Sequence, residues 1–124
     1  MKVKRIKIGI KNLKEVLEDF AETAKSIEKG EKVKKRRGIY FENLDTFRRA
    51  LTEKRLEILH VIKEKHPSSV YALAKILDRN IKNVTEDLEY LKEIELVEIK
   101  RSKEKRKRVI PQVNYDTVAV EIRI

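Results

Sequence analysis

The spacing of apolar residues changes along the chain, from alternation at both ends to a helical period in the middle. Ile6, Ile8 and Ile10 alternate with other residues and predict a strand over residues 3–10. Residues 117–124 alternate in the same way and predict a last, half-buried strand. Between them, spacings of three and four residues indicate helices with one apolar face. The pattern therefore predicts an α+β fold that is mainly α.

The first expected helix follows the first strand. Asn12 can cap this helix, with Glu15 three residues later as its reciprocal partner. Gly30 is typical of a helix end. The apolar positions share one face and are Leu13, Val16, Leu17, Phe20, Ala24 and Ile27.

Three more elements are expected before residue 67. Residues 38–41 form a short apolar run that predicts a second strand. Asn43 can cap a short helix, and Thr52 can cap a longer one that ends before Pro67, because the residue before proline disfavours helix. The residues expected to face inward on these two helices are Leu44, Phe47 and Leu51, then Leu56, Ile58, Leu59, Val61 and Ile62.

Residues 67–91 carry the most informative pattern. They predict a short helix that starts at Ser68 or Ser69, a tight turn at residues 78–80, and a second amphipathic helix capped by Asn80. Two short helices that cross at a steep angle form a helix-turn-helix, whose second helix enters the major groove of DNA. The inward positions are Val70, Leu73, Ala74 and Leu77 on the first helix, and Ile81, Val84, Leu88 and Leu91 on the second.

A β-hairpin is expected after these helices. Residues 96–99 alternate and predict one strand, Val109 and Ile110 predict the returning strand, and Pro111 fits a strand end. The tip would be residues 101–108, which contain six basic side chains. A basic hairpin beside a recognition helix would be a wing, which grips DNA phosphates.

Positive charge is confined to two segments of a chain whose formal net charge is +10. Residues 1–38 contain 13 basic and 6 acidic side chains, a net charge of +7, and residues 101–108 contain 6 and 1, a net charge of +5. Residues 39–100 contain 11 and 12, and residues 109–124 contain 1 and 2. Such a distribution favours nucleic acid as the partner. The alternative is a lysine-rich surface that only keeps the protein soluble.

Several function classes find no support in the sequence. No apolar stretch approaches the roughly 20 residues that span a membrane, and the first residues lack the features of a signal peptide. Cysteine is absent, and His60 and His66 do not show a metal-ligand spacing. The chain has no Gly-rich phosphate loop and no nucleophile elbow. We therefore expect a cytoplasmic protein that is not an enzyme and has no cofactor, and the abundance of Lys and Glu fits a thermophile.

The central motifs resemble those of a known group of proteins. The matching residues are Pro67-x-Ser69-Val70-x-x-Leu73-Ala74, Leu77-x-Arg79-Asn80, Val84-x-x-Asp87-Leu88-x-x-Leu91 and Leu96-Val97. They resemble the winged helix-turn-helix of predicted transcriptional regulators of archaea and bacteria, relatives of the MarR and ArsR types. Residues 41–44, 51–56 and the N-terminal strand and helix also match, so the resemblance covers nearly the whole chain.

The resemblance implies a winged helix-turn-helix with an N-terminal strand-helix extension. It further implies a sequence-specific regulator of transcription, a repressor, that binds double-stranded DNA as a homodimer. Some bacterial members of the group resemble DNA-binding antitoxins, so a toxin is an alternative partner, and a winged domain that binds only protein is another. The chain departs from the pattern at Asp78 and Glu95, where glycine is usual, and both turns must therefore tolerate a non-glycine residue.

The expected DNA contacts come from the recognition helix, residues 80–94, and from the wing. Outward side chains near the start of the helix can reach base edges, because Asn pairs with adenine, Lys with guanine, Thr with the thymine methyl group and Glu with cytosine. These residues are Lys82, Asn83, Thr85 and Glu86. The wing residues expected to contact phosphate or the minor groove are Arg101, Lys103, Lys105, Arg106, Lys107 and Arg108.

Each of these residue sets has a structural alternative. The helix side chains can form an ordinary solvated face, and the wing charges can protect a sheet edge. Asp87 can pair with Arg79 or Arg55 as a structural ion pair. A second basic run is either a further DNA contact or a solvated loop, and its members are Lys32, Lys34, Lys35, Arg36 and Arg37.

The expected organisation has two parts. Residues 1–38 would be a strand-helix extension that builds the dimer, and residues 39–124 would be the DNA-binding domain. The alternative is that the first helix packs on its own domain.

Overall fold

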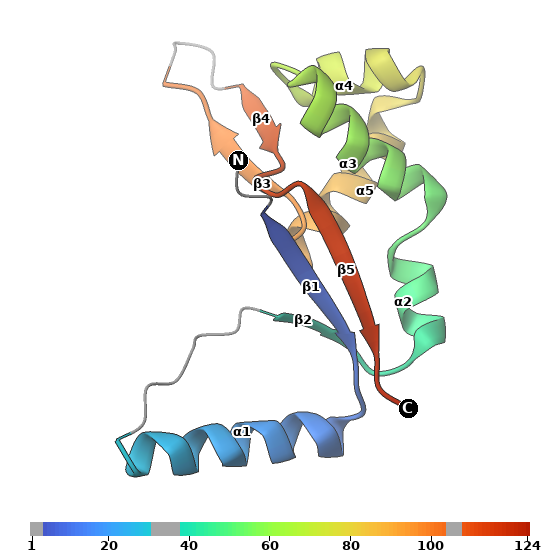
Figure 1. The fold of residues 1–124 in the computed structure, drawn as a ribbon. Coiled ribbons are helices and arrows are strands. Elements are labelled where there is room, and N and C mark those ends of the chain that lie inside the picture. The colour runs from blue at the N-terminus through green and yellow to red at the C-terminus, as the bar shows by residue number, and fades with distance from the viewer. Residues whose placement is uncertain (1–3, 31–37, 104–107) are drawn as a thin grey trace. The chain divides into compact units, whose positions relative to one another are not determined.

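The computed structural model describes residues 4–30, 38–103 and 108–124 (Figure 1). Within these ranges the protein is a mixed α+β chain of five helices and five strands. It groups into a helical unit, which contains Lys4 and residues 51–116, and a sheet unit, which contains residues 5–50 and 117–124. The sequence predicts a division at residue 38, and the strand that begins at that residue pairs with the strand Arg5–Ile10. The expected role of residues 1–38 in dimerisation stays a prediction.

The sheet unit is built on three parallel strands. β1 (Arg5–Ile10) lies between β2 (Gly38–Phe41) and β5 (Thr117–Ile122). All three strands are expected from the sequence, β1 and β5 from alternation and β2 from its short apolar run. Their pairing joins the two ends of the described chain. Ile8 lies beside Ile39 on one side and Val120 on the other, so the apolar positions of the three strands share one face.

The opposite face of the sheet is polar and includes a close backbone approach. Lys7 pairs with Glu121 at 2.7 Å, and this hydrogen bond holds the pKa of the Glu121 carboxyl below its usual value. Gly9 lies under the ring of Tyr40, and a Cβ atom at this position would come within 2.9 Å of that ring. Glycine is therefore the residue that lets Tyr40 cross β1 here.

The two helices of the sheet unit begin where the sequence predicts. α1 (Leu13–Glu28) is capped by Asn12, whose Oδ1 accepts a hydrogen bond from the Glu15 amide at 2.9 Å. Asn43 accepts from the amide of Thr46 in the same way before α2 (Leu44–Ala50). α2 packs Phe47 edge-to-face on Phe41, with ring centroids 5.7 Å apart, whereas none of the residues of α1 is buried.

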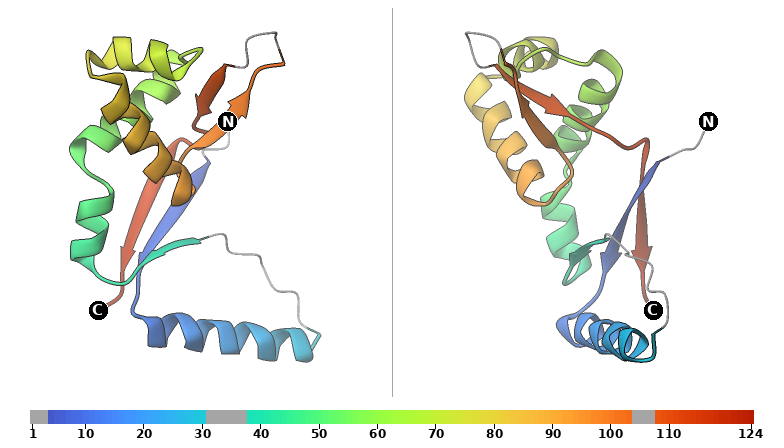
Figure 2. Two further views of the ribbon diagram at one scale, coloured as in Figure 1. Left: turned by 180° about the vertical axis from the view of Figure 1, so that it is seen from behind. Right: turned by 90° about the vertical axis from the view of Figure 1, so that its left-hand side faces the viewer.

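The helical unit contains three helices and a hairpin. Its elements are α3 (Glu53–Lys65), α4 (Val70–Leu77), α5 (Ile81–Glu93), β3 (Glu98–Arg101) and β4 (Val109–Gln112). β3 and β4 pair antiparallel, as the sequence predicts. α3 and α4 both contact β4, and Figure 2 shows this group from two further sides. The fully buried side chains at its centre include Ile58, Ile62, Leu73, Val84, Leu91 and Leu96.

Three apolar residues that the periodicity places on an inward face are exposed. Leu44, the first residue of α2, is 44% exposed. Leu56 is 46% exposed, because it precedes Ile58 by two residues and so lies about 200° from it around the helix. Ile81 is also 46% exposed. It is the first residue of α5, and helical side chains lean toward the N-terminus, so its side chain projects beyond the packed part of the helix.

A pair of hydrogen bonds joins Lys4 and Asp116, which both belong to the helical unit. The Lys4 amide donates to Oδ2 of Asp116 at 2.9 Å, and the Asp116 amide donates to the Lys4 carbonyl at 2.8 Å. The Lys4 amide, together with the Lys63 ammonium at 3.2 Å, holds the pKa of the Asp116 carboxyl below its usual value. Nearby, the buried Tyr115 hydroxyl donates to the Leu96 carbonyl at 2.8 Å, and burial raises the pKa of this hydroxyl.

Replacing Glu95 with glycine should stabilise the protein by about 0.5–1 kcal/mol. Glu95 has φ +66°, a left-handed conformation that costs a residue with a Cβ about 1–2 kcal/mol and costs glycine little. The gain is reduced because glycine adds entropy to the unfolded chain. Urea unfolding measures the change. The control is Glu89→Gly, at an exposed position in the interior of α5, which should lower stability by about 1 kcal/mol. A loss of stability in both variants would contradict the expectation.

Candidate nucleic-acid interface

The short helix α4 is fixed at its start and along one face. Ser69 caps it, with its Oγ accepting from the Ala72 amide at 3.0 Å, and Leu73 and Ala74 are buried. The sequence leaves Ser68 and Ser69 open as the start, and the structure selects Ser69. α4 contacts α3, α5 and β4, so its position is determined from three sides.

The turn between α4 and α5 uses a left-handed residue. Asp78 has φ +52° and donates its amide to the Lys75 carbonyl at 3.1 Å, while the Arg79 amide reaches the Ala74 carbonyl at 3.1 Å. Asn80 then caps α5, with its Oδ1 accepting from the Lys82 amide at 2.8 Å. Asp78 thus adopts the left-handed conformation for which glycine is usual at this turn, and the turn tolerates a non-glycine residue as the sequence predicts.

Helix α5 buries one face and exposes the other at its leading end. Val84, Leu88 and Leu91 are buried, and Lys82, Asn83 and Glu86 are exposed. Thr85 is half-buried, and its hydroxyl donates to the Ile81 carbonyl at 2.7 Å. Three of the four side chains expected to read bases therefore point to solvent, and the hydroxyl proton of the fourth is used within the helix.

A shared carboxylate joins α5 to α3 and to the turn. Asp87 accepts from Nε of Arg55 at 3.1 Å and from Nη2 of Arg79 at 2.9 Å. The side chains involved are only 18–19% exposed. The sequence offers Arg79 or Arg55 as the partner, and the structure has both.

Tyr90 supports this ion-pair group, and sequence reasoning missed it. The guanidinium of Arg55 lies over the Tyr90 ring, 4.1 Å from its centre. Residues 55 and 90 belong to different helices, so no local spacing in the sequence could reveal their contact. Together, the ionic and ring contacts fix the angle at which α5 leaves the turn.

The described part of the β3–β4 hairpin presents exposed cations. Arg101, Lys103 and Arg108 are all exposed. The hairpin closes around Ser102, whose amide donates to the Arg108 carbonyl at 3.0 Å and whose Oγ accepts from the Arg108 amide at 3.1 Å. The other expected wing residues, Lys105, Arg106 and Lys107, lie outside the described residues, as do Lys32, Lys34, Lys35, Arg36 and Arg37 of the second basic run.

Other kinds of site find little material in the described part of the chain. No group of three or more His, Cys, Asp or Glu residues there could hold a metal ion. His60 and His66 are both exposed. A shallow hollow of the helical unit is lined by polar groups that include Lys63, Lys100 and Asp116. Among the described helices, none combines the length and the apolar character that crossing a membrane requires.

Comparison with known sequences identifies a family to which the chain is similar. None of the curated proteins is significantly similar to the chain. The family HVO_A0114 matches residues 50–120, which include all of α3, α4, α5 and the hairpin. Because the match spans more than half of the 124 residues, the chain belongs to the HVO_A0114 family.

Proposed function

We propose that the protein is a transcriptional regulator that binds double-stranded DNA sequence-specifically through a winged helix-turn-helix. The observation that carries the proposal is the leading end of α5. There Lys82, Asn83 and Glu86 are exposed on a helix whose opposite face is locked into the core by Val84 and Leu88. A rigid helix with free polar side chains in its first turns is what base recognition in the major groove requires.

The arrangement of elements supports this proposal. α4, the turn at Asp78–Asn80 and α5 have the order and lengths of a helix-turn-helix, and α3 packs against α4. The β3–β4 hairpin follows directly and contacts α3 and α4, which is the place of a wing. In this proposal the N-terminal extension consists of β1 and α1, and β5 from the end of the chain pairs with β1 in the same sheet.

The charges along α5 favour one way of entering the groove. Lys82 lies in the first turn, whereas Glu89, Glu93 and Glu95 are exposed at or beyond the far end. A helix lying flat on DNA would bring these carboxylates close to phosphates. A helix inserted by its leading end keeps them away, so we propose end-on insertion.

The hairpin cations support the same orientation. The side chains of Arg101, Lys103 and Arg108 are exposed. Within the described residues, no ion pair and no contact with an aromatic ring is seen for them. Their proposed role is to neutralise phosphates beside the groove that α5 enters. Because phosphate contacts carry no sequence information, discrimination between sites is left to α5.

The test of this function is selection of bound fragments from random duplex DNA, followed by affinity measurement on the selected site. We expect an enriched near-palindromic site with half-sites about 34 Å apart, because a two-fold dimer presents two recognition helices. Failure to enrich any sequence, with no duplex binding at moderate salt, would contradict the proposal.

Replacing Asn83 with alanine should change the preferred sequence. Removing one bidentate base interaction costs about 1–3 kcal/mol on the cognate site and little on unrelated DNA. The control is Glu64→Ala, an exposed residue of α3, which should leave the selected sequence unchanged. If Asn83→Ala weakened all duplexes equally, Asn83 would not be a base-reading residue.

A further inference from the structure

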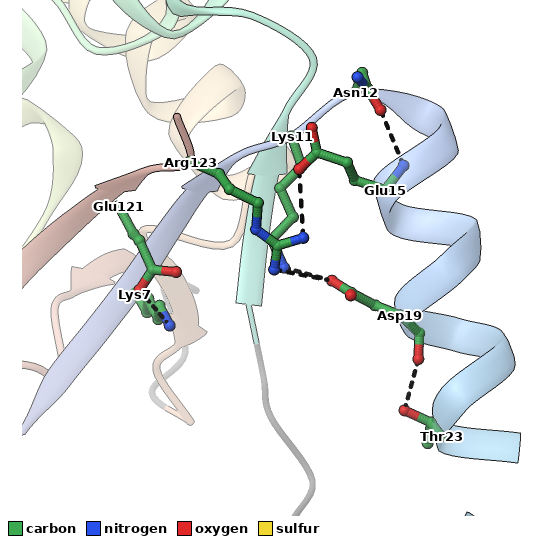
Figure 3. A network of polar contacts seen from close by, with 8 residues as sticks. All are labelled: Lys7, Lys11, Asn12, Glu15, Asp19, Thr23, Glu121 and Arg123. Atoms are coloured by element: carbon green, nitrogen blue, oxygen red, sulfur yellow. Dashed lines mark hydrogen bonds and ion pairs between the residues drawn. The ribbon is translucent and has the colours of Figure 1, made fainter. Parts of the chain in front are cut away.

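Helix α1 is held to the sheet unit by its polar side. Asp19 pairs with the Lys11 ammonium at 2.6 Å, and Arg123 lies 3.4 Å from Glu15 and 3.8 Å from Asp19 (Figure 3). These carboxylates come from one side of the helix, and the cations come from the ends of β1 and β5. The contacts that position α1 are therefore ionic.

The apolar side of α1 is exposed. Leu13, Leu17, Phe20 and Ile27 are 58–73% exposed, and no residue of the helix is buried. Asp19 follows Leu17 by two residues, which places it about 200° from Leu17 around the helix. The anchoring side and the apolar side are thus opposite, so the anchored helix presents its apolar residues outward.

The spacing of these apolar residues is that of a coiled-coil seam. Residues 13, 17, 20, 24 and 27 are separated by four, three, four and three positions, which is an uninterrupted a/d repeat. Val16 flanks this stripe on one side and is half-buried, so the exposed part of the face is the a/d seam. A narrow seam of this kind fits another helix, whereas a helix that packs on its own domain usually shows a wider apolar face. The face therefore has the form of a helix-pairing surface.

We infer that α1 pairs with α1 of a second copy of this chain in an antiparallel arrangement. In the matching register Leu17 lies opposite Ile27 of the second copy, and Phe20 lies opposite Ala24 of the second copy. The largest residue of the seam then faces the smallest, and Ala21 lies next to its own symmetry mate at the two-fold axis. Each of the two central layers therefore pairs a large side chain with a small one, and each outer layer pairs leucine with isoleucine.

Charge complementarity supports the antiparallel direction. In this register Lys14 flanks the seam opposite Glu28 of the second copy, and the two-fold axis repeats the pair at the other end. Both side chains are exposed. In a parallel pair Phe20 would instead face Phe20, and Lys14 and Glu28 would be separated by about 21 Å along the helix axis.

This inference specifies the dimer on which the proposed DNA-binding function rests, but it is tested without DNA. We expect wild-type protein to sediment as a dimer at about 100 µM, since a helix pair of this length gives micromolar affinity at best. A monomer that binds DNA would overturn the pairing and leave DNA binding in place. A dimer of this kind that binds no duplex DNA would support the pairing of α1 and contradict the proposed DNA binding.

Charge reversal tests the register. Lys14→Glu and Glu28→Lys should each raise the dimer dissociation constant on the order of tenfold, because two attractive pairs become repulsive. An equimolar mixture of the two variants should associate about as tightly as wild type, as should the double variant. Both substitutions suit the helix dipole, so unwinding of α1 would not explain a loss of association.

The other outcomes overturn the inference. A wild-type dimer that is insensitive to both single variants uses a different surface. Weakened single variants that do not recover on mixing exclude the antiparallel register. Since the chain contains no cysteine, Ala21→Cys should also cross-link with a short bismaleimide, whereas the matched control Glu18→Cys, on the side of α1 away from the seam, should not.

Discussion

Replacing Arg101, Lys103 and Arg108 with alanine should weaken binding to double-stranded DNA about 100-fold near 0.1 M salt. All three side chains are exposed on the described part of the β3–β4 hairpin, and each can neutralise about one phosphate. The slope of log K against log salt should become shallower by about 0.9 for each phosphate that is no longer neutralised. Fluorescence anisotropy over a range of salt concentrations measures both quantities, with the selected site and an unrelated duplex.

The matched control removes three positive charges elsewhere in the helical unit. Lys54, Lys65 and Lys92 are exposed and lie on α3 and α5. Their triple alanine variant has the same net charge as the hairpin variant and should keep most of the salt slope. Equal losses of affinity in the two variants would show that DNA responds to overall charge, and the hairpin would then have no specific role.

Replacing Asp87 with asparagine should lower the free energy of unfolding by about 2 kcal/mol. Its carboxylate is shared by Arg55 and Arg79, and the side chains are only 18–19% exposed, so the two guanidinium groups would lose their common counter-charge. Breaking a fully buried pair costs about 3–5 kcal/mol, and the remaining exposure reduces that value. Thermal and urea unfolding measure the change, and Tm should fall by roughly 4–10 °C.

The control for this variant is Asp45→Asn. Asp45 pairs with Arg49 one turn later on α2, at 3.0 Å, but these side chains are 70% and 81% exposed. Such a pair contributes at most about 0.5 kcal/mol. If Asp87→Asn and Asp45→Asn had equally small effects, the Asp87 group would not fix the position of α5.

Local signals in the sequence predict most of the elements. The caps at Asn12, Asn43, Thr52 and Asn80 each place a helix start correctly, because capping depends on a few neighbouring residues. Periodicity likewise identifies the strands at both ends and the hairpin. Periodicity fails for Leu56. The spacing of this residue from its apolar neighbours is close to the helical period and predicts burial, but the side chain is exposed.

Contacts between distant segments could not be predicted in the same way. Alternation predicts β1 and β5 but not that they pair in parallel, because the apolar pattern within one strand does not specify which strand lies beside it or in which direction. The sequence suggests one arginine as the partner of Asp87, and the position of Tyr90 over Arg55 depends on the packing of α3 against α5. For the candidate interface, the sequence predicts the outward face of α5 because the buried residues Val84, Leu88 and Leu91 define it by exclusion.

The paired hydrogen bonds between Lys4 and Asp116 have a consequence for how the chain folds. They lie one residue before Arg5 and Thr117, the first pair in the β1–β5 register. Joining strands that are 112 positions apart carries a large loop-closure entropy when the intervening chain is unfolded. If residues 51–116 fold first from their short-range helical contacts, the Lys4–Asp116 hydrogen bonds bring the starts of β1 and β5 together. Pairing of these two strands can then proceed from Arg5 and Thr117 at a much smaller entropy cost.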